Sequence, residues 1–288
     1  MTERPFRYDQ ELPSRLETLN DVHPVLSLWT ESAGLDSATG HRVAVAVTEA
    51  ITNAIIHAHA KCPEKTVLVR LWTDADRLCA EVGDRGPRPW AAPPPDQAVD
   101  WEQTNGRGLA LIRLLAHEFS IEPRRQGGTM VRMTFLGNEQ ARSNSHSVAA
   151  GMAVGTALGR IEQGEHKMDY RVEKHESVDV VRISGRLDLV SSNNLKDCVR
   201  QRLGEKRTLL VLNMKGVDFI NSSGLGALVS ILKDVRLVNG RLVLSELAPY
   251  VQEIFAITQL SNVFEIHTTE KEAVQSVEAN PESELVKN

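Results

Sequence analysis

Three polar residues recur at a spacing of four within the apolar segment 42–60, RVAVAVTEAITNAIIHAHA. On a helix, Glu49, Asn53 and His57 would follow one another about 40° apart around the axis and form a single polar line. The apolar residues recur at i, i+4, i+7, i+8 and i+11 from Val43, which is the buried stripe of an amphipathic helix. The polar line is therefore either a solvated helix face or one wall of a site.

A carboxylate follows directly after an apolar strand. Asp84 has the same strand parity as Leu78, Ala80 and Val82, so we expect it at the end of the inward-facing row. A carboxylate that has no role beyond being solvated is seldom found in such an inward-facing position. Gly86, two residues later, permits a tight turn or the close approach of a ligand.

Gly106 and Gly108 precede a third apolar segment, in the sequence NGRGLALI. Free backbone N–H groups and the helix dipole at such a helix N-terminus can bind phosphate. Glycines are common in turns, so either glycine motif alone is weak. The polar line, the Asp84 motif and this motif together, in this order, predict a nucleotide site.

Two adjacent hydroxyls stand at the start of another helix, in VDFINSSGLGAL, where an apolar strand leads to Ser222 and Ser223. Ser222 could be the N-cap of a helix that begins at Ser223 or Gly224, because a serine side chain accepts a hydrogen bond from a free N–H there. It could also be a substrate hydroxyl, and the two interpretations are compatible.

The elements that must position these residues divide into two α/β patterns. In the first pattern, some segments have an apolar residue at every second position, which predicts strands. Others have an apolar spacing of about 3.6 residues, which predicts helices. We expect strands at 6–12, 66–72, 77–84, 119–124 and 128–136, and helices at 21–32, 37–59 and 106–118, with Pro24 in the first turn of its helix and a turn at Gly127 and Gly128.

The second pattern is β-β-α-β-α-β-α-β-α, which predicts a sheet covered by helices, largely on one side. Its expected strands are 169–175, 178–188, 208–214, 241–247 and 264–268, and its helices start near Ser191, Ser222, Ala248 and Thr269. The stretch 186–194 is interpreted as a strand end followed by a helix cap. Between the two patterns, residues 138–167 are polar and then Gly-rich, which predicts a flexible linker. The alternative is a short contact helix, because the glycines at 151, 155 and 159 are four residues apart.

Composition restricts the class of protein. The 288 residues carry a net charge of -5 and contain no basic stripe, so direct nucleic-acid binding is not expected. The three cysteines lack CxxC spacing, and no signal peptide or apolar run of the roughly 20 residues that span a bilayer is seen. We therefore expect a soluble, cytoplasmic protein without disulfides, zinc or a membrane partner.

The first 137 residues resemble the GHKL (Bergerat-fold) ATP-binding domains, and in particular the anti-sigma-factor serine kinases. The N-box of that family matches Glu49 and Asn53, its first glycine box matches Asp84 and Gly86, and its second matches Gly106 and Gly108. The resemblance implies an ATP site in which Asn53 ligates Mg²⁺, Asp84 accepts a hydrogen bond from the adenine amino group and the second box contacts phosphates. It also implies that Glu49 is the general base.

This sequence departs from the family at two places. Arg88 stands where the first box often has a second glycine, and three consecutive prolines, 93–95, lie in the segment that corresponds to the lid over ATP. Prolines would stiffen that lid. Trp90 and Trp101 in the same segment are either lid anchors or buried packing residues.

Nearly all of residues 168–280 resemble a STAS domain of the anti-sigma-factor antagonist kind, through ISGRLD (183–188), the segment 209–228 and the strand GRLVLSEL. In that family the first serine of a D-S-[ST]-G-L-G motif is the phosphoacceptor. The resemblance assigns this role to Ser222, with Ser223 as its neighbour. Asn221 precedes it where Asp is usual.

The sequence thus predicts a mixed α/β (α+β) chain with three parts: a GHKL kinase-like domain (1–137), a flexible linker (138–167) and a STAS domain (168–288). The first hypothesis is an ATP-dependent protein serine kinase fused to its own phosphoacceptor, acting in partner switching with a sigma factor or with separate anti-sigma or STAS proteins. The alternatives are a non-catalytic, nucleotide-dependent binding switch and an ATPase that drives dimer rearrangement. Kinases that the chain resembles are often dimers, so a homodimer is also considered.

Overall fold

The computed structural model describes residues 6–59, 62, 64–87, 107–125, 127–137 and 168–279. The chain folds as two compact units, an N-terminal and a C-terminal one, and each is described by itself. None of the helices within the described residues is both long and apolar enough to cross a membrane.

The N-terminal unit contains one five-stranded sheet in the order β1-β2-β3-β5-β4, with every neighbouring pair antiparallel. Its strands are β1 (Arg7–Pro13), β2 (Thr66–Asp74), β3 (Arg77–Gly83), β4 (Glu118–Pro123) and β5 (Thr129–Leu136). The predicted inward rows are buried, because Val67, Val69 and Leu71 of β2 and Leu78, Ala80 and Val82 of β3 are all at most 2% exposed. The alternation in the sequence therefore identified the core face of this sheet.

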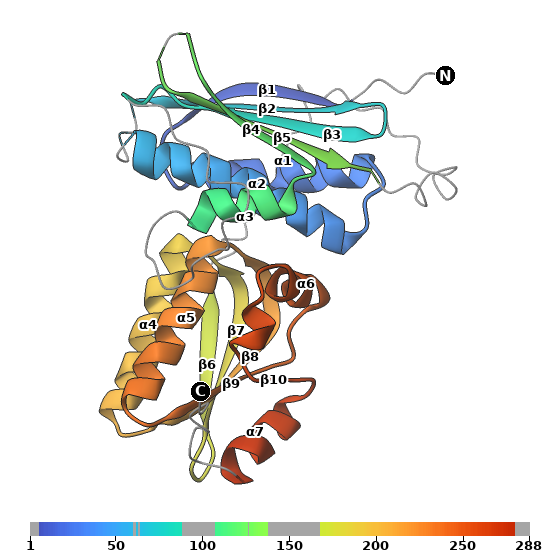
Figure 1. Ribbon diagram of the computed structural model, residues 1–288. Coiled ribbons are helices and arrows are strands. Elements are labelled where there is room, and N and C mark those ends of the chain that lie inside the picture. The colour runs from blue at the N-terminus through green and yellow to red at the C-terminus, as the bar shows by residue number, and fades with distance from the viewer. Residues whose placement is uncertain are drawn as a thin grey trace. The chain divides into compact units, whose positions relative to one another are not determined.

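Three helices cover that face on one side (Figure 1): α1 (Thr18–Ser32), α2 (Ser37–Asn53) and α3 (Arg107–Leu115). Helix α1 starts three residues earlier than expected, so Pro24 lies inside the helix and not in its first turn. Proline there cannot donate to the carbonyl four residues before it. Buried contacts compensate, since Val22, Leu26 and Trp29 of α1 are fully buried.

The predicted helix 37–59 is not α-helical to its end. Helix α2 continues after Asn53 as a single π-helical turn, η1 (Ala54–Ala58), which closes with the bond from the His59 N–H to the Ala54 carbonyl (3.1 Å). Such wide turns inside helices are frequent at functional sites. The extra residue in this turn changes the direction of every side chain after Asn53.

The C-terminal unit also has a five-stranded sheet, in the order β10-β9-β8-β7-β6. Only the β6–β7 pair is antiparallel. The strands are β6 (Asp169–Lys174), β7 (Asp179–Leu187), β8 (Leu209–Ile220), β9 (Arg241–Ser245) and β10 (Ile266–His267). The helices are α4 (Leu189–Gly204), α5 (Ser222–Leu237), α6 (Pro249–Ile257), the 3-10 turn η3 (Leu260–Asn262) and α7 (Glu270–Ala279). This is the predicted element order.

Helices lie on both faces of this sheet, which corrects the expectation that they would lie largely on one. Figure 1 shows α4 and α5 on one side and α7 on the other. Ala273 and Val277 of α7 form a core cluster with Val180, Val211 and Val243. The reason is visible in β7, where residues 179–181 are all fully buried, because parallel strands need cover on both faces.

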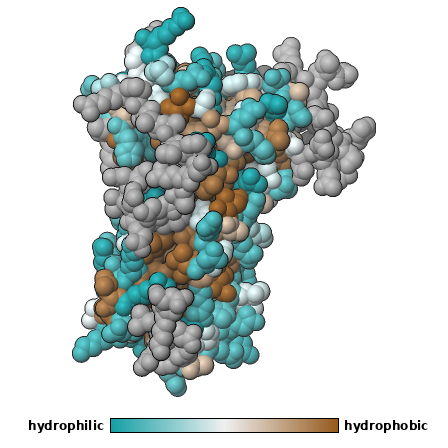
Figure 2. Space-filling model, viewed as in Figure 1, coloured by the Kyte–Doolittle hydropathy of each residue, from teal (hydrophilic) through white to brown (hydrophobic). Residues whose placement is uncertain are grey.

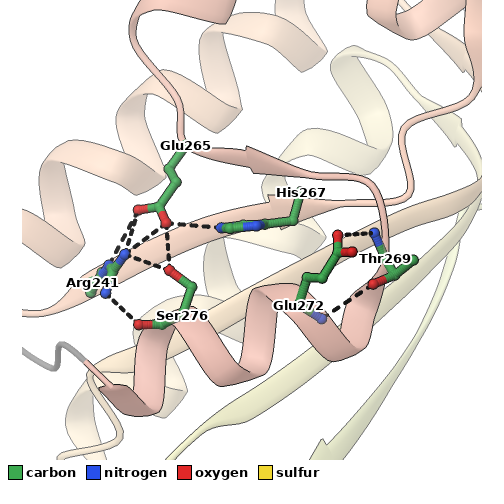
Figure 3. Close-up of polar contacts among 6 residues, drawn as sticks. All are labelled: Arg241, Glu265, His267, Thr269, Glu272 and Ser276. Atoms are coloured by element: carbon green, nitrogen blue, oxygen red, sulfur yellow. Dashed lines mark hydrogen bonds and ion pairs between the residues drawn. The ribbon is translucent and has the colours of Figure 1, made fainter.

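A polar network attaches α7 to the sheet (Figure 3). Glu265 accepts hydrogen bonds from Arg241 Nη2 (2.7 Å), Ser276 Oγ (2.7 Å) and His267 Nε2 (2.9 Å), and Arg241 Nη1 also donates to the Ser276 carbonyl (2.7 Å). Burial alone would raise the pKa of Glu265, but these bonds outweigh it and lower the pKa to about 2. Val274 also packs against the core cluster that contains Ala273 and Val277, but the rest of α7 is mainly polar, and Figure 2 shows mainly hydrophilic side chains where Figure 1 places this helix.

Candidate functional site

Glu49, Asn53 and Gly108 meet in the N-terminal unit, where the start of α3 crosses the polar side of α2. A Cβ atom added to Gly108 would lie 2.6 Å from Glu49 Oε2 and 3.0 Å from Asn53 Nδ2. A side chain at this position would require Glu49 or Asn53 to shift. The structure therefore brings together two motifs that are 55 residues apart in the sequence, and glycine in the second permits their close approach.

Glu49 and Asn53 do not lie on a solvated helix face. Glu49 is buried and only 2% exposed, Asn53 is half-buried, and His57, the third member of the predicted line, is exposed. The π-helical turn begins directly after Asn53, so His57 no longer continues the line. The polar wall consists of Glu49 and Asn53 alone.

Asn53 has an unused polar atom. Within the described ranges its buried Nδ2 has no hydrogen-bond partner. A buried amide nitrogen without a partner has two donor hydrogens that a ligand could satisfy. Mg²⁺ prefers oxygen ligands and takes few from protein, so this amide oxygen beside a carboxylate suits it. The described residues contain no cluster of three His, Cys, Asp or Glu that could hold a metal.

Asp84 is fully buried at the end of β3, as its strand parity predicted. Its Oδ1 accepts hydrogen bonds from the N–H groups of Gly86 (2.7 Å) and Thr129 (3.2 Å), and its exposed fraction is 1%. A Cβ on Gly86 would lie 2.8 Å from that of Ala58, so this glycine does permit a close approach, here to the end of the π-helical turn. Both of these bonds end on Oδ1.

Other residues that support Asp84 were not identified from the sequence. Gly128 has φ +87°, and a Cβ on it would lie 2.2 Å from the Asp84 carbonyl oxygen, which also accepts from Arg124 Nη1 (2.9 Å). His59 accepts a bond at Nε2 from the Arg85 N–H (3.0 Å). The predicted turn at Gly127 and Gly128 marked one of these positions, but no local pattern distinguished His59 from His57.

Several predicted features lie outside the described residues. These are Gly106, Arg88, Trp90, Trp101, the prolines 93–95 and the linker 138–167.

In the C-terminal unit Ser222 is the first residue of α5 and is buried, with 7% exposed. The N-cap is Asn221, whose Oδ1 accepts from the N–H groups of Ser223 and Gly224, both at 3.1 Å. The interpretation of Ser222 as N-cap is therefore wrong, because the helix starts one residue earlier than that interpretation requires. Asn221 supplies the cap, so the Ser222 hydroxyl is not used for it.

The start of α5 lies beside the start of α4. The Asn221 N–H donates to the Leu187 carbonyl (3.3 Å), and a Cβ on Gly224 would lie 2.2 Å from the same oxygen. The next residue, Asp188, caps α4 and forms a capping box with Ser191, as expected for a strand end followed by a cap. Two helix N-termini thus lie at the carboxyl ends of the neighbouring parallel strands β7 and β8, a common place for ligand and functional sites.

A cavity of about 700 Å³ lies elsewhere in this unit, lined among others by Arg182, Asn213, Lys215, Glu246 and Glu270. Several of its charged groups pair with one another. Arg182 Nε donates to Glu270 (2.8 Å), Asn213 Nδ2 donates to Glu270 (2.6 Å) and Glu246 (2.5 Å), and Lys215 pairs with Glu246 (3.6 Å). These contacts join β7, β8 and α7 and so contribute to the packing of the unit.

Two family models match the chain. The one described as a histidine kinase-like ATPase domain covers residues 12–135, and the one described as a STAS domain covers residues 169–273. The C-terminal region is 30% identical to the anti-sigma-B factor antagonist of Bacillus subtilis over 104 residues (36% of this chain, 94% of the relative). It is 28% identical to the anti-sigma F factor antagonist of Paenibacillus polymyxa over 116 residues (38% and 96%).

Among solved structures, an anti-sigma factor antagonist from Mycobacterium paratuberculosis matches 39% of this chain and 96% of its own, with 23% identity and a TM-score of 0.35. The RsbU and RsbW domains of Rv1364c from Mycobacterium tuberculosis match 46% of this chain and 32% of their own, with 22% identity and a TM-score of 0.34.

The chain is thus a mixed α/β protein that joins an ATPase-like domain to a STAS domain. Through its C-terminal region it belongs to the STAS family, whose matched members are named as anti-sigma factor antagonists, and its N-terminal region is a histidine kinase-like ATPase domain, which implies ATP binding.

Proposed function

We propose that this protein is an ATP-dependent protein serine kinase fused to its own phosphoacceptor domain, and that it acts in partner-switching control of transcription. The observation that carries the proposal is the convergence of Glu49, Asn53 and Gly108, with Asp84 buried at the end of β3. This convergence supports the roles that we propose for the residues within the described ranges.

Phosphoryl transfer requires charge neutralisation and an aligned nucleophile, with little covalent chemistry from the protein. Mg²⁺, when bound, would supply the positive charge, and Asn53 would hold it. Asp84 Oδ2 would accept a hydrogen bond from the adenine amino group while Oδ1 keeps its bonds to the backbone. Gly106 and Gly108 would present the free N–H groups at the start of α3 to phosphate.

Glu49 would be the general base. It would accept the proton of the attacking serine hydroxyl as the bond from that oxygen to the γ-phosphorus forms and the bond to ADP breaks. Its burial supports this role, because a carboxylate that is only 2% exposed is protected from bulk water.

Ser222 would be the acceptor, with Ser223 as its neighbour. Its hydroxyl is not the cap of α5, so phosphorylation would leave the Asn221 cap intact. A phosphate at a helix N-terminus is also favoured by the dipole. The added charge of about -1.5 to -2 would instead disrupt an interface that fits a neutral hydroxyl. The partners would be a sigma factor or separate anti-sigma or STAS proteins.

A non-catalytic, nucleotide-dependent binding switch is the second candidate, and Asn221 favours it. Aspartate is usual at this position in the antagonists that the chain resembles, and the buried Asn221 amide removes that negative charge from the position next to Ser222. In this case ATP would be bound but Ser222 would not be phosphorylated.

The test is phosphosite mapping of the full chain after incubation with Mg·ATP, by intact mass and peptide mass spectrometry. We expect one phosphate on Ser222, lost in Ser222→Ala and kept in Ser230→Ala, a serine further along the same helix. Glu49→Ala should lower the rate by about 10²–10⁴-fold, the usual contribution of a general base, while Glu31→Ala on the surface of α1 should not. Bound ATP without any phosphate on the chain would support the binding switch instead.

A further inference from the structure

His59 is a fully buried histidine between the end of β1 and the segment after β3, with 1% exposed. Both ring nitrogens have partners from distant parts of the chain. Nδ1 lies 3.0 Å from Ser14 Oγ, and Nε2 lies 3.0 Å from the backbone nitrogen of Arg85. The imidazole thus bridges two loops that are about 70 residues apart in the sequence.

These contacts define one tautomer. A backbone N–H can only donate, so Nε2 must carry the lone pair that accepts from Arg85. The ring proton is then on Nδ1 and is donated to Ser14 Oγ. A second proton on the ring would place an N–H at Nε2 against the N–H of Arg85, and the hydrogen bond would be lost.

The bond to Arg85 holds the centre of the segment proposed to bind adenine. On one side, the Asp84 N–H donates to the Thr129 carbonyl (2.9 Å), and on the other, the Gly86 N–H donates to Asp84 Oδ1 (2.7 Å). The three consecutive N–H groups of Asp84, Arg85 and Gly86 are therefore each bound. Only the middle bond ends on a group that titrates near neutral pH.

We propose that His59 is a positioning residue for the nucleotide site, which holds Asp84 and Gly86 in place only while its imidazole is neutral, so that nucleotide affinity decreases in acid. This inference rests on the proposed function, because it assumes that the Asp84 segment binds adenine. His59 itself does not contact the nucleotide in this scheme.

The charges around His59 favour the neutral ring at physiological pH. Burial is the largest effect and lowers the pKa of His59 below its ordinary value of 6.5; Asp84 acts to raise it, and Lys65 to lower it. The Arg85 guanidinium is paired with Glu11 (2.8 Å), and the Cys62 N–H donates to the His59 carbonyl (3.0 Å). Because the folded pKa is depressed, the neutral form is present above 6.5 and is lost only as the pH falls through the lower value.

The test is the affinity of the full chain for Mg·ADP between pH 5.5 and 8, by titration calorimetry. For a single linked proton, we expect the affinity to fall by up to about tenfold per pH unit below the pKa of His59. His59→Gln should bind at pH 8 and lose this dependence, because the glutamine oxygen can accept from Arg85 but does not titrate. His117→Gln, an exposed histidine of the same unit, is the matched control, and the titration of the ADP phosphates is common to all three proteins.

A second measurement needs no variant. In the unaltered protein, nitrogen NMR should show His59 protonated at Nδ1, and ADP should lower its pKa further. A His59→Gln profile that follows the parent, or a proton on Nε2, would overturn the role of His59. Absence of ADP binding by the parent at pH 8 would overturn the proposed function itself, so the two failures are distinguishable.

Discussion

At the scale of single residues, Gly108 is where the parts of the candidate nucleotide site meet. A side chain at position 108 would enter the space that the ends of the Glu49 and Asn53 side chains occupy. The same is true of Gly86 beside Ala58 and of Gly128 beside Asp84. The site is therefore shaped by close backbone approach as much as by its polar side chains.

Gly108→Ala tests this packing. We expect at least a tenfold loss of Mg·ADP affinity, about 1.4 kcal/mol, because the new methyl group would displace Glu49 or Asn53. Gly204→Ala is the control, since a Cβ there meets nothing within 4 Å. Calorimetry and a thermal melt of both variants separate binding from folding, and an unchanged affinity in Gly108→Ala would contradict the close contact.

At the scale of elements, helix starts decide how the C-terminal unit presents its serines. Asn221 caps α5 and Asp188 caps α4, and both helices begin at adjacent strand ends. Capping side chains accept hydrogen bonds through an oxygen, which both Asn and Asp provide. The departure at Asn221 therefore preserves the local structure and changes only its charge.

We expect Asn221→Ala to destabilise the C-terminal unit by about 1 kcal/mol, through loss of the cap. Asn221→Asp should keep the cap, but the cost of burying a carboxylate at a position that is 1% exposed offsets the gain from the helix dipole, so we expect a stability close to that of the parent. Urea denaturation of the full chain, followed by a probe in the C-terminal unit, measures both. Equal stability of the alanine variant and the parent would rule out the cap as a stabilising contact.

Glu265 links α7 to the sheet in a way that depends on pH. Its pKa is lowered to about 2, so the carboxylate stabilises the fold above its unfolded pKa of about 4.5, and this contribution is lost as the pH falls towards 2. Since the side chain is 39% exposed, solvent screening limits the contribution to roughly 1 kcal/mol or less. Glu265→Gln should reduce stability at pH 7 and flatten its decline between pH 4.5 and 2 in urea titrations. A decline as steep as that of the parent would mean that other carboxylates cause it.

At the scale of the whole molecule, the kinase-like and STAS units belong to one chain. The predicted boundaries after residues 137 and 167 remain predictions, because they border segments outside the described residues. If residues 138–167 form the coil that their composition predicts, the tether would give an effective concentration in the millimolar range. Transfer within one chain would then be faster than transfer between chains at micromolar protein.

We therefore expect the rate of Ser222 phosphorylation to be independent of protein concentration. In a mixture of Glu49→Ala and Ser222→Ala chains, the Glu49→Ala chain should acquire little phosphate, because its only active partner is a separate molecule. Mass spectrometry distinguishes the two chains. A rate proportional to concentration, with efficient labelling in the mixture, would establish transfer between chains.

The sequence by itself determined the elements and most of the candidate site residues, because these depend on local patterns. Alternation identified the inward rows of β2 and β3 and placed Asp84 at the end of one, and the element order of the C-terminal unit followed from strand and helix spacing. The motif order then led to the two domain families that the comparisons found.

Only the tertiary structure decided how those residues meet. The contact of Gly108 with Glu49 and Asn53, the bridge from His59 to Arg85 and the approach of Gly128 to Asp84 all join segments far apart in the chain. The π-helical turn after Asn53 and the cap at Asn221 depend on a shift of a single residue, which periodicity does not resolve. Side-chain spacing reports which face of an element is buried, whereas the partner across that face is set by packing.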